Sequence, residues 1–177
     1  SGAREVLKKI GVTNEQFYDA IRTFEGAAGR LEVIGEKPGS VAIYKDFAHA
    51  PSKVTATVKA VREIYPSREL VACVELHTYS SLNKKFLPQY KGTLKNAQVP
   101  VVYFNPENVK AKRLEPLSAS DIRAAFANPR LEVFDQPEKL ESFLMKQPWE
   151  NRNLLMMSSG NFGGLDLATL STKILAG

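Results

Sequence analysis

A carboxylate and an imidazole stand three positions apart in "KDFAHAP", between a strand-like run and a helix-like run. Asp46, at the end of a strand, could accept two hydrogen bonds from a vicinal diol such as a ribose, because an ionised carboxylate only accepts. His49, beside the start of the helix, could stack on a ring or donate a hydrogen bond. Simpler roles stay open for both residues, Asp46 as a turn cap and His49 as an ordinary surface residue.

A second polar segment, "SSGNFGG" (158–164), lies between an apolar run and another helical pattern. Its glycines could let backbone N–H groups line up toward an anion. It has neither the G-x-G-x-x-G spacing of dinucleotide sites nor the Gly-Lys-Ser/Thr of a P-loop. Turns of this composition also occur without a ligand, so both interpretations stay open.

A third segment, "ELHTYSSLN", places four hydroxyls directly after His77. A Ser-His-Asp hydrolase is disfavoured because the chain has no G-x-S-x-G elbow. A zinc site is disfavoured as well, since the two histidines and the single cysteine stand in unrelated surroundings. No metal ligands are therefore expected.

The surrounding patterns predict the elements that must position these segments. Two β-rich runs flank a Pro38–Gly39 turn and predict a hairpin. After it, strand-like and helix-like segments alternate, which predicts right-handed crossovers and a mostly parallel sheet. The expected fold class is α/β, a three-layer Rossmann-like domain with about six strands plus an N-terminal hairpin. Strands are expected at 70–76, 99–104, 131–134 and 153–159, and helices at 53–65, 118–129, 137–147 and 165–177, with a broken helical connection at 84–97.

The chain starts with two further helical patterns within its first 26 residues, the second with Thr13 and Gln16 spaced as a capping box. Ser118 and Asp121 have the same spacing before a later helix.

In an open parallel sheet, ligands bind beyond the carboxyl ends of the strands. The loops after the predicted strands, including 103–113, are therefore expected to converge on one binding face.

Composition narrows the function classes. The 177 residues are 44% hydrophobic and 24% charged, typical of a globular domain. The net charge is +5, but lysines and arginines are scattered and form no nucleic-acid motif, so anionic small ligands are favoured over nucleic acid. No apolar run reaches the roughly 20 residues of a membrane span. The single Cys73 lies in an apolar run, which favours a reducing cytoplasm and a buried thiol.

These segments together resemble the C-terminal domain of the Mur ligases, the ATP-dependent amide-forming enzymes of peptidoglycan assembly. "DFAHAP" resembles the family's Asp-Tyr-(Ala/Gly)-His-x-Pro, and Arg30 in "AAGRLEV" matches its upstream Gly-Arg. "LHTYS" resembles the histidine-led loop of the branch that acts on UDP-N-acetylmuramate. "MMSSGNFGGLD" is similar to the Gly-rich turn of the muropeptide-recycling branch. The resemblance extends from "TFEGAAGR" to the end of the chain.

This resemblance implies that Arg30, Asp46 and His49 bind ATP, with Asp46 at the ribose. Thr78 and Ser81 stand where the alanine-adding branch has arginines for the amino acid's carboxylate, which implies a peptide as the amine substrate. Ala50 departs from the family by lacking a side chain that could cap the next helix. The residues implied to face the amine substrate are His77, Thr78, Ser80, Ser158, Ser159, Gly160 and Asn161.

The family also implies what surrounds this chain. Residues 1–177 would be one C-terminal domain of a three-domain ligase, with Mg²⁺ and the phosphates of ATP held by a missing central domain and the sugar nucleotide by a missing N-terminal one. The ligase would join UDP-N-acetylmuramate to an amino acid or peptide, as in L-alanyl-γ-D-glutamyl-meso-diaminopimelate, through an acyl phosphate. The chain alone is expected to be inactive. The alternatives are a stand-alone nucleotide-binding or regulatory module and a basic nucleic-acid-binding domain.

Overall fold

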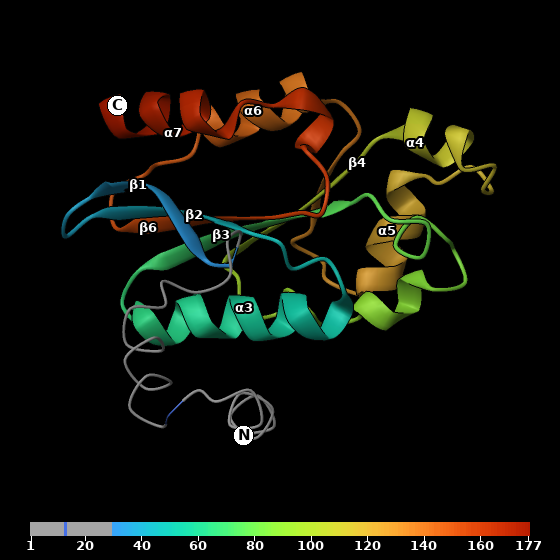
Figure 1. Cartoon of the computed structure of the whole chain (residues 1–177), viewed down its shortest axis with the longest axis horizontal. Coiled ribbons are helices and arrows are strands. Elements are labelled where there is room, and N and C mark those ends of the chain that lie inside the picture. The colour runs from blue at the N-terminus through green and yellow to red at the C-terminus, as the bar shows by residue number, and fades with distance from the viewer. Residues whose placement is uncertain (1–12, 14–29) are drawn as a thin grey trace.

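A computed structural model describes Thr13 and residues 30–177 (Figure 1). The two helices expected within the first 26 residues, and the Thr13–Gln16 capping box, lie outside the described part of the chain. Within that part, no helix is long and apolar enough to cross a membrane.

The centre of the domain is one six-stranded sheet with the order β1-β2-β6-β3-β4-β5. Strands β1 and β2 form the antiparallel hairpin, and every other neighbouring pair is parallel. The predicted mostly parallel sheet and N-terminal hairpin are thus confirmed, and the hairpin supplies two of the six strands. The strands are β1 (Glu32–Lys37), β2 (Val41–Asp46), β3 (Glu69–Leu76), β4 (Val99–Phe104), β5 (Glu132–Phe134) and β6 (Arg152–Met157).

Helices cover both faces of this sheet and make three layers (Figure 1). On one face lie α3 (Pro51–Ile64), α5 (Ala119–Phe126) and the 3₁₀ turn η1 (Leu87–Tyr90); on the other lie α6 (Pro137–Met145) and α7 (Leu167–Ala176). Side chains alternate along β3, so that Ala72 and Val74 pack in the core under α3 while Cys73 packs in the core under α6 and α7. Because β3 is buried on both faces, its sequence is a nearly continuous apolar run.

Two connections differ from a simple alternation. The stretch 84–97, expected as a broken helix, contains only the short η1 and hydrogen-bonded turns. The stretch 103–113, expected as a loop, contains α4 (Pro106–Ala111), whose N-cap Asn105 accepts a hydrogen bond from the N–H of Glu107. Six residues are too few to show a helical repeat, although Asn followed by Pro is a helix-start signal.

Candidate functional site

The three polar segments meet at the carboxyl ends of β2, β6 and β3, which are neighbours in the sheet. The registers place Asp46 beside Met157 and Met157 beside Val74. Directly beyond this row, the N–H of Ser158 donates to the carbonyl oxygen of Asp46 at 2.9 Å. This hydrogen bond joins the "KDFAHAP" segment to the Gly-rich turn.

Asp46 is only 7% exposed, and both of its carboxylate oxygens accept hydrogen bonds. Oδ2 accepts from the N–H of Leu31 at 2.6 Å, and Oδ1 accepts from the N–H of Ala48 at 2.6 Å and from the Thr57 hydroxyl at 3.5 Å. Leu31 has a φ of 42°, a left-handed conformation that a branched residue adopts only when its surroundings hold it there. Asp46 therefore orders both the turn after β2 and the segment next to Arg30. Its oxygens keep some acceptor capacity, and its contact with a ribose stays a prediction.

An aromatic pair and an exposed cation adjoin the backbone segments that Asp46 binds. His49 Nδ1 is 2.9 Å from the carbonyl oxygen of Phe47, and the two rings pack edge to face with centroids 5.2 Å apart. Phe47 is 57% exposed, and Arg30 is exposed one residue before Leu31. Exposed ring surfaces can stack on a planar ligand, and a guanidinium can pair with an anionic one. Ala50 supplies no side-chain cap to α3, as its type predicts.

The loop after β3 is held by its own hydroxyls. Thr78 Oγ1 donates to Ser81 Oγ at 3.0 Å and accepts from the Ser81 N–H at 3.2 Å, while Ser80 stays exposed. Ser81 is 1% exposed, whereas Tyr79 and Ser80 are exposed and Thr78 is half-buried, so these three hydroxyls remain accessible to a ligand.

Tyr90, which the sequence patterns did not single out, connects η1 to the "KDFAHAP" segment. Its hydroxyl donates to the carbonyl oxygen of His49. Burial raises the pKa of Tyr90 to about 12, opposed by a hydrogen bond with Ser81. This buried phenol therefore fixes the His49 turn against η1.

The Gly-rich turn is organised by Glu75, a second residue missed from the sequence. Its side chain is 1% exposed inside β3; Oε2 accepts from the Ser158 hydroxyl and from the N–H of Phe162 at 2.9 Å. Ser158 Oγ in turn accepts from the N–H of Gly160 at 2.6 Å. A lone carboxylate in an apolar strand, two positions before His77, was the available signal, since a buried charge requires partners.

His77 lies in contact with this turn. A Cβ on Gly160 would stand 2.6 Å from His77 Nδ1 and 2.8 Å from Glu75 Oε2, so only glycine allows this approach. His77 Nδ1 is also 3.5 Å from Glu75 Oε1 and 3.4 Å from the side-chain nitrogen of Asn108, which α4 supplies. The imidazole therefore sits where β3, β6 and α4 meet.

The remaining predicted residues lie around this contact. Ser159 Oγ is buried without a hydrogen-bond partner in the described structure, and Asn161 is exposed on the turn. Within residues 30–177, no hydrogen bond joins Ser80 or Asn161 to His77. The segments thus share one edge of the sheet, with the nucleotide candidates on the β2 side and the amine candidates on the β3 side.

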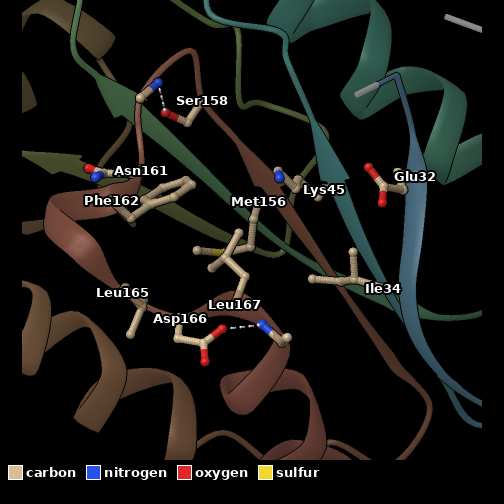
Figure 2. Close-up of a pocket in the computed structure, with 12 residues that line it drawn as sticks. Glu32, Ile34, Lys45, Met156, Ser158, Asn161, Phe162, Leu165, Asp166 and Leu167 are labelled. Carbon is tan, nitrogen blue, oxygen red and sulfur yellow. Dashed lines mark hydrogen bonds between the residues drawn. The ribbon is translucent and has the colours of Figure 1, made fainter. Parts of the chain in front are cut away.

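A cavity of about 390 Å³ opens beside the Gly-rich turn, between β1, β2 and β6 and the start of α7 (Figure 2). Ser158, Gly160 and Asn161 border it. No cluster of three or more His, Cys, Asp or Glu side chains able to hold a metal ion occurs among the residues that the structure places.

Comparison with protein families gives one matching model, described as "Mur ligase, glutamate ligase domain", over residues 29–160. Among curated proteins, UDP-N-acetylmuramate–L-alanine ligase of Nitrosomonas europaea is 28% identical over 181 residues, covering 96% of this chain and 37% of that protein. The chain thus spans little more than a third of the length of this relative.

Two solved structures share the fold. The murein peptide ligase of Psychrobacter arcticus has a TM-score of 0.71 and 22% identity over 95% of this chain and 34% of its own. A domain of a UDP-N-acetylmuramate:L-alanyl-γ-D-glutamyl-meso-diaminopimelate ligase from Haemophilus ducreyi has a TM-score of 0.58 and 27% identity. That comparison covers 82% of this chain and 99% of the Haemophilus domain.

Proposed function

Because the chain belongs to the Mur ligase family, as its C-terminal domain, we propose that it binds ATP and the amine substrate in a ligase that forms an amide on UDP-N-acetylmuramate. The family resemblance of the sequence motifs is confirmed, and Mur ligases are ATP-dependent ligases. The observation that carries the proposal is the hydrogen bond from Ser158 to Asp46, which sets the nucleotide candidates and the amine candidates side by side at one sheet edge.

On the β2 side, we assign Arg30, Asp46 and His49 to ATP. ATP supplies the phosphoryl group that activates the muramyl carboxylate. Arg30 offers a charge for the nucleotide, and the His49 and Phe47 rings offer a surface beside it. Asp46 holds these groups in place through Leu31 and Ala48, with its remaining acceptor capacity directed to the ribose.

On the β3 side, we assign the amine substrate to His77, Thr78, Ser80 and the turn Ser158–Asn161. The described loop has no cation at positions 78–81, and Thr78 and Ser81 are bonded to each other. A free amino acid would therefore find no partner for its carboxylate here, which favours a peptide, L-alanyl-γ-D-glutamyl-meso-diaminopimelate. Ser159 belongs to this turn, although its Oγ is buried and makes no hydrogen bond with any residue that the structure describes.

The rest of the reaction needs other domains. We propose that residues 1–177 close over a central domain that holds the phosphates and Mg²⁺, and that this closure excludes water from the acyl phosphate. The chain contributes orientation and desolvation, and on its own it forms no amide.

The test is a ligation assay with the full-length ligase that contains this chain. With ATP, Mg²⁺ and UDP-N-acetylmuramate, the tripeptide should give the amide product and ADP, detected by mass spectrometry, with a kcat/KM at least about tenfold above that of L-alanine. The chain 1–177 alone is the control and should give no product. A preference for L-alanine would overturn the peptide assignment, and the absence of any ATP-dependent amide would overturn the proposed function.

A further inference from the structure

The cavity beside the Gly-rich turn has an apolar wall and a charged rim. Figure 2 shows Met156, Phe162 and Leu167 directed into it from β6, the turn and α7, with Ile34 opposite on β1. At about 390 Å³ it lies within the range of small-molecule sites. The wall is continuous enough to cover a short aliphatic chain.

Two opposite charges stand at the rim, Glu32 on β1 and Lys45 on β2. They are register partners across the hairpin, so both side chains face this side of the sheet. Both residues are exposed, and neither makes a hydrogen bond or ion pair with any residue that the structure describes. An exposed cross-strand pair is weak even when it forms, so both charges remain available to a ligand.

The start of α7 does not add an anion site. Asp166, its N-cap, accepts from the N–H groups of Ala168 at 3.0 Å and Thr169 at 3.3 Å. A purely anionic ligand would meet Glu32 and Asp166, and a purely cationic one would meet Lys45. A group that carries both charges on one carbon complements Lys45 and Glu32 together.

We propose that this groove binds the amino-carboxylate end of a peptide substrate, with Lys45 at the carboxylate, Glu32 at the ammonium and Met156 and Phe162 along the aliphatic chain. The inference rests on the proposed function, because it places the far end of the amine substrate. The groove shares Ser158, Gly160 and Asn161 with the amine face. A substrate can therefore present its reacting amine at His77 and its opposite end at Lys45. A diaminopimelate side chain ends in such a group.

Three related aliphatic ligands distinguish the contribution of the carboxylates from that of the ammonium groups. The ¹⁵N-labelled chain 1–177 is titrated with meso-diaminopimelate, with pimelate, which lacks the amines, and with 1,5-diaminopentane, which lacks the carboxylates. Amide shifts of Phe162 and Leu167 report on the groove. We expect meso-diaminopimelate to bind at least about fivefold more tightly than either analogue.

Single variants then test which group of the ligand Lys45 and Glu32 each bind. Lys45→Met should reduce the affinity for meso-diaminopimelate to that for 1,5-diaminopentane, and Glu32→Gln should reduce it to that for pimelate. Lys59→Met, on α3 on the opposite face of the sheet, should change nothing. The inference would be overturned if the three ligands bound with equal affinity or if none of them shifted the amide signals. It would also be overturned if Lys45→Met bound meso-diaminopimelate as tightly as the wild type.

These titrations use neither ATP nor ligation, so their failure is distinct from a failure of the proposed function. If the ligase uses the tripeptide but the groove does not respond to meso-diaminopimelate, only the groove assignment is wrong.

Discussion

Asp46 accepts a 2.6 Å hydrogen bond from the backbone N–H of Leu31, the residue that follows Arg30. A carboxylate at the end of β2 thus holds a cation-bearing segment fifteen positions earlier in the chain. This explains why Arg30 and the Asp-x-x-His segment occur together in the sequence, since the Asp46 side chain orders the backbone next to both.

The isolated chain should bind ATP at best with millimolar affinity. The residues assigned to ATP offer a ring surface, the guanidinium of Arg30 and a carboxylate whose two oxygens already accept backbone hydrogen bonds, which leaves few contacts for a nucleotide. Isothermal titration calorimetry of residues 1–177 measures this affinity. Micromolar binding would mean that the chain is a nucleotide-binding module in its own right.

Gly160→Ala should destabilise the domain by about 1–3 kcal/mol, because its Cβ would overlap the His77 ring and Glu75. Denaturant unfolding measures the loss, and the resonances of His77, one of only two histidines, should move. Gly39→Ala is the matched control. It places a side chain at a φ of 80° with no atom within 4 Å, so it should cost about 1 kcal/mol and leave His77 unchanged. Equal effects of both variants on His77 would refute the contact.

Tyr90→Phe should lower the free energy of unfolding by about 1 kcal/mol, because it leaves the His49 carbonyl oxygen without its donor. Hydrogen exchange of the amides at residues 47–50 should accelerate. Tyr79→Phe, which removes a hydroxyl from a side chain that is 61% exposed, should have no effect. Unchanged exchange in Tyr90→Phe would show that the phenol does not hold the His49 turn.

Acid should weaken the α5 cap. The hydroxyl and N–H of Ser118 and the ammonium of Lys84 lower the pKa of Asp121 from 3.8 to about 2. A carboxyl whose pKa is lower in the folded state stabilises fully above its unfolded pKa and loses that contribution as the pH falls toward 2. The melting temperatures of wild type and Asp121→Asn should therefore differ at pH 5 and converge by pH 2. A difference that grows with acidity would contradict the assignment.

The fold, and the meeting of the polar segments at one end of the sheet, could be predicted from the sequence. The Ser118–Asp121 capping box, confirmed in α5, depends on residues three apart. The turn after β2 is likewise local, since Asp46 and Ala48 bond across two positions. The polar segments follow successive predicted strands. Because parallel strands have their carboxyl ends on the same side of a sheet, these segments were expected to lie together.

Glu75, Tyr90 and Asn108 were missed because their roles depend on contacts distant in sequence. Glu75 meets Ser158 across 83 positions, and Tyr90 meets His49 across 41. Glu75 lies in an apolar strand, and Tyr90 lies in the irregular connection 84–97. No periodicity or motif identifies such partners.

The most direct test of the account is a pair of variants in the full-length ligase, Asp46→Ala and Gly160→Ala, measured by steady-state kinetics with ATP and the tripeptide. The account predicts a crossed result: Asp46→Ala raises the KM for ATP about tenfold with a smaller effect on the peptide, and Gly160→Ala raises the KM for the peptide more than that for ATP. Asp135→Ala, an exposed carboxylate paired with Lys139, should leave both constants unchanged. If Asp46→Ala raises the peptide's KM more than that for ATP, the division of the sheet edge into a nucleotide side and an amine side is wrong.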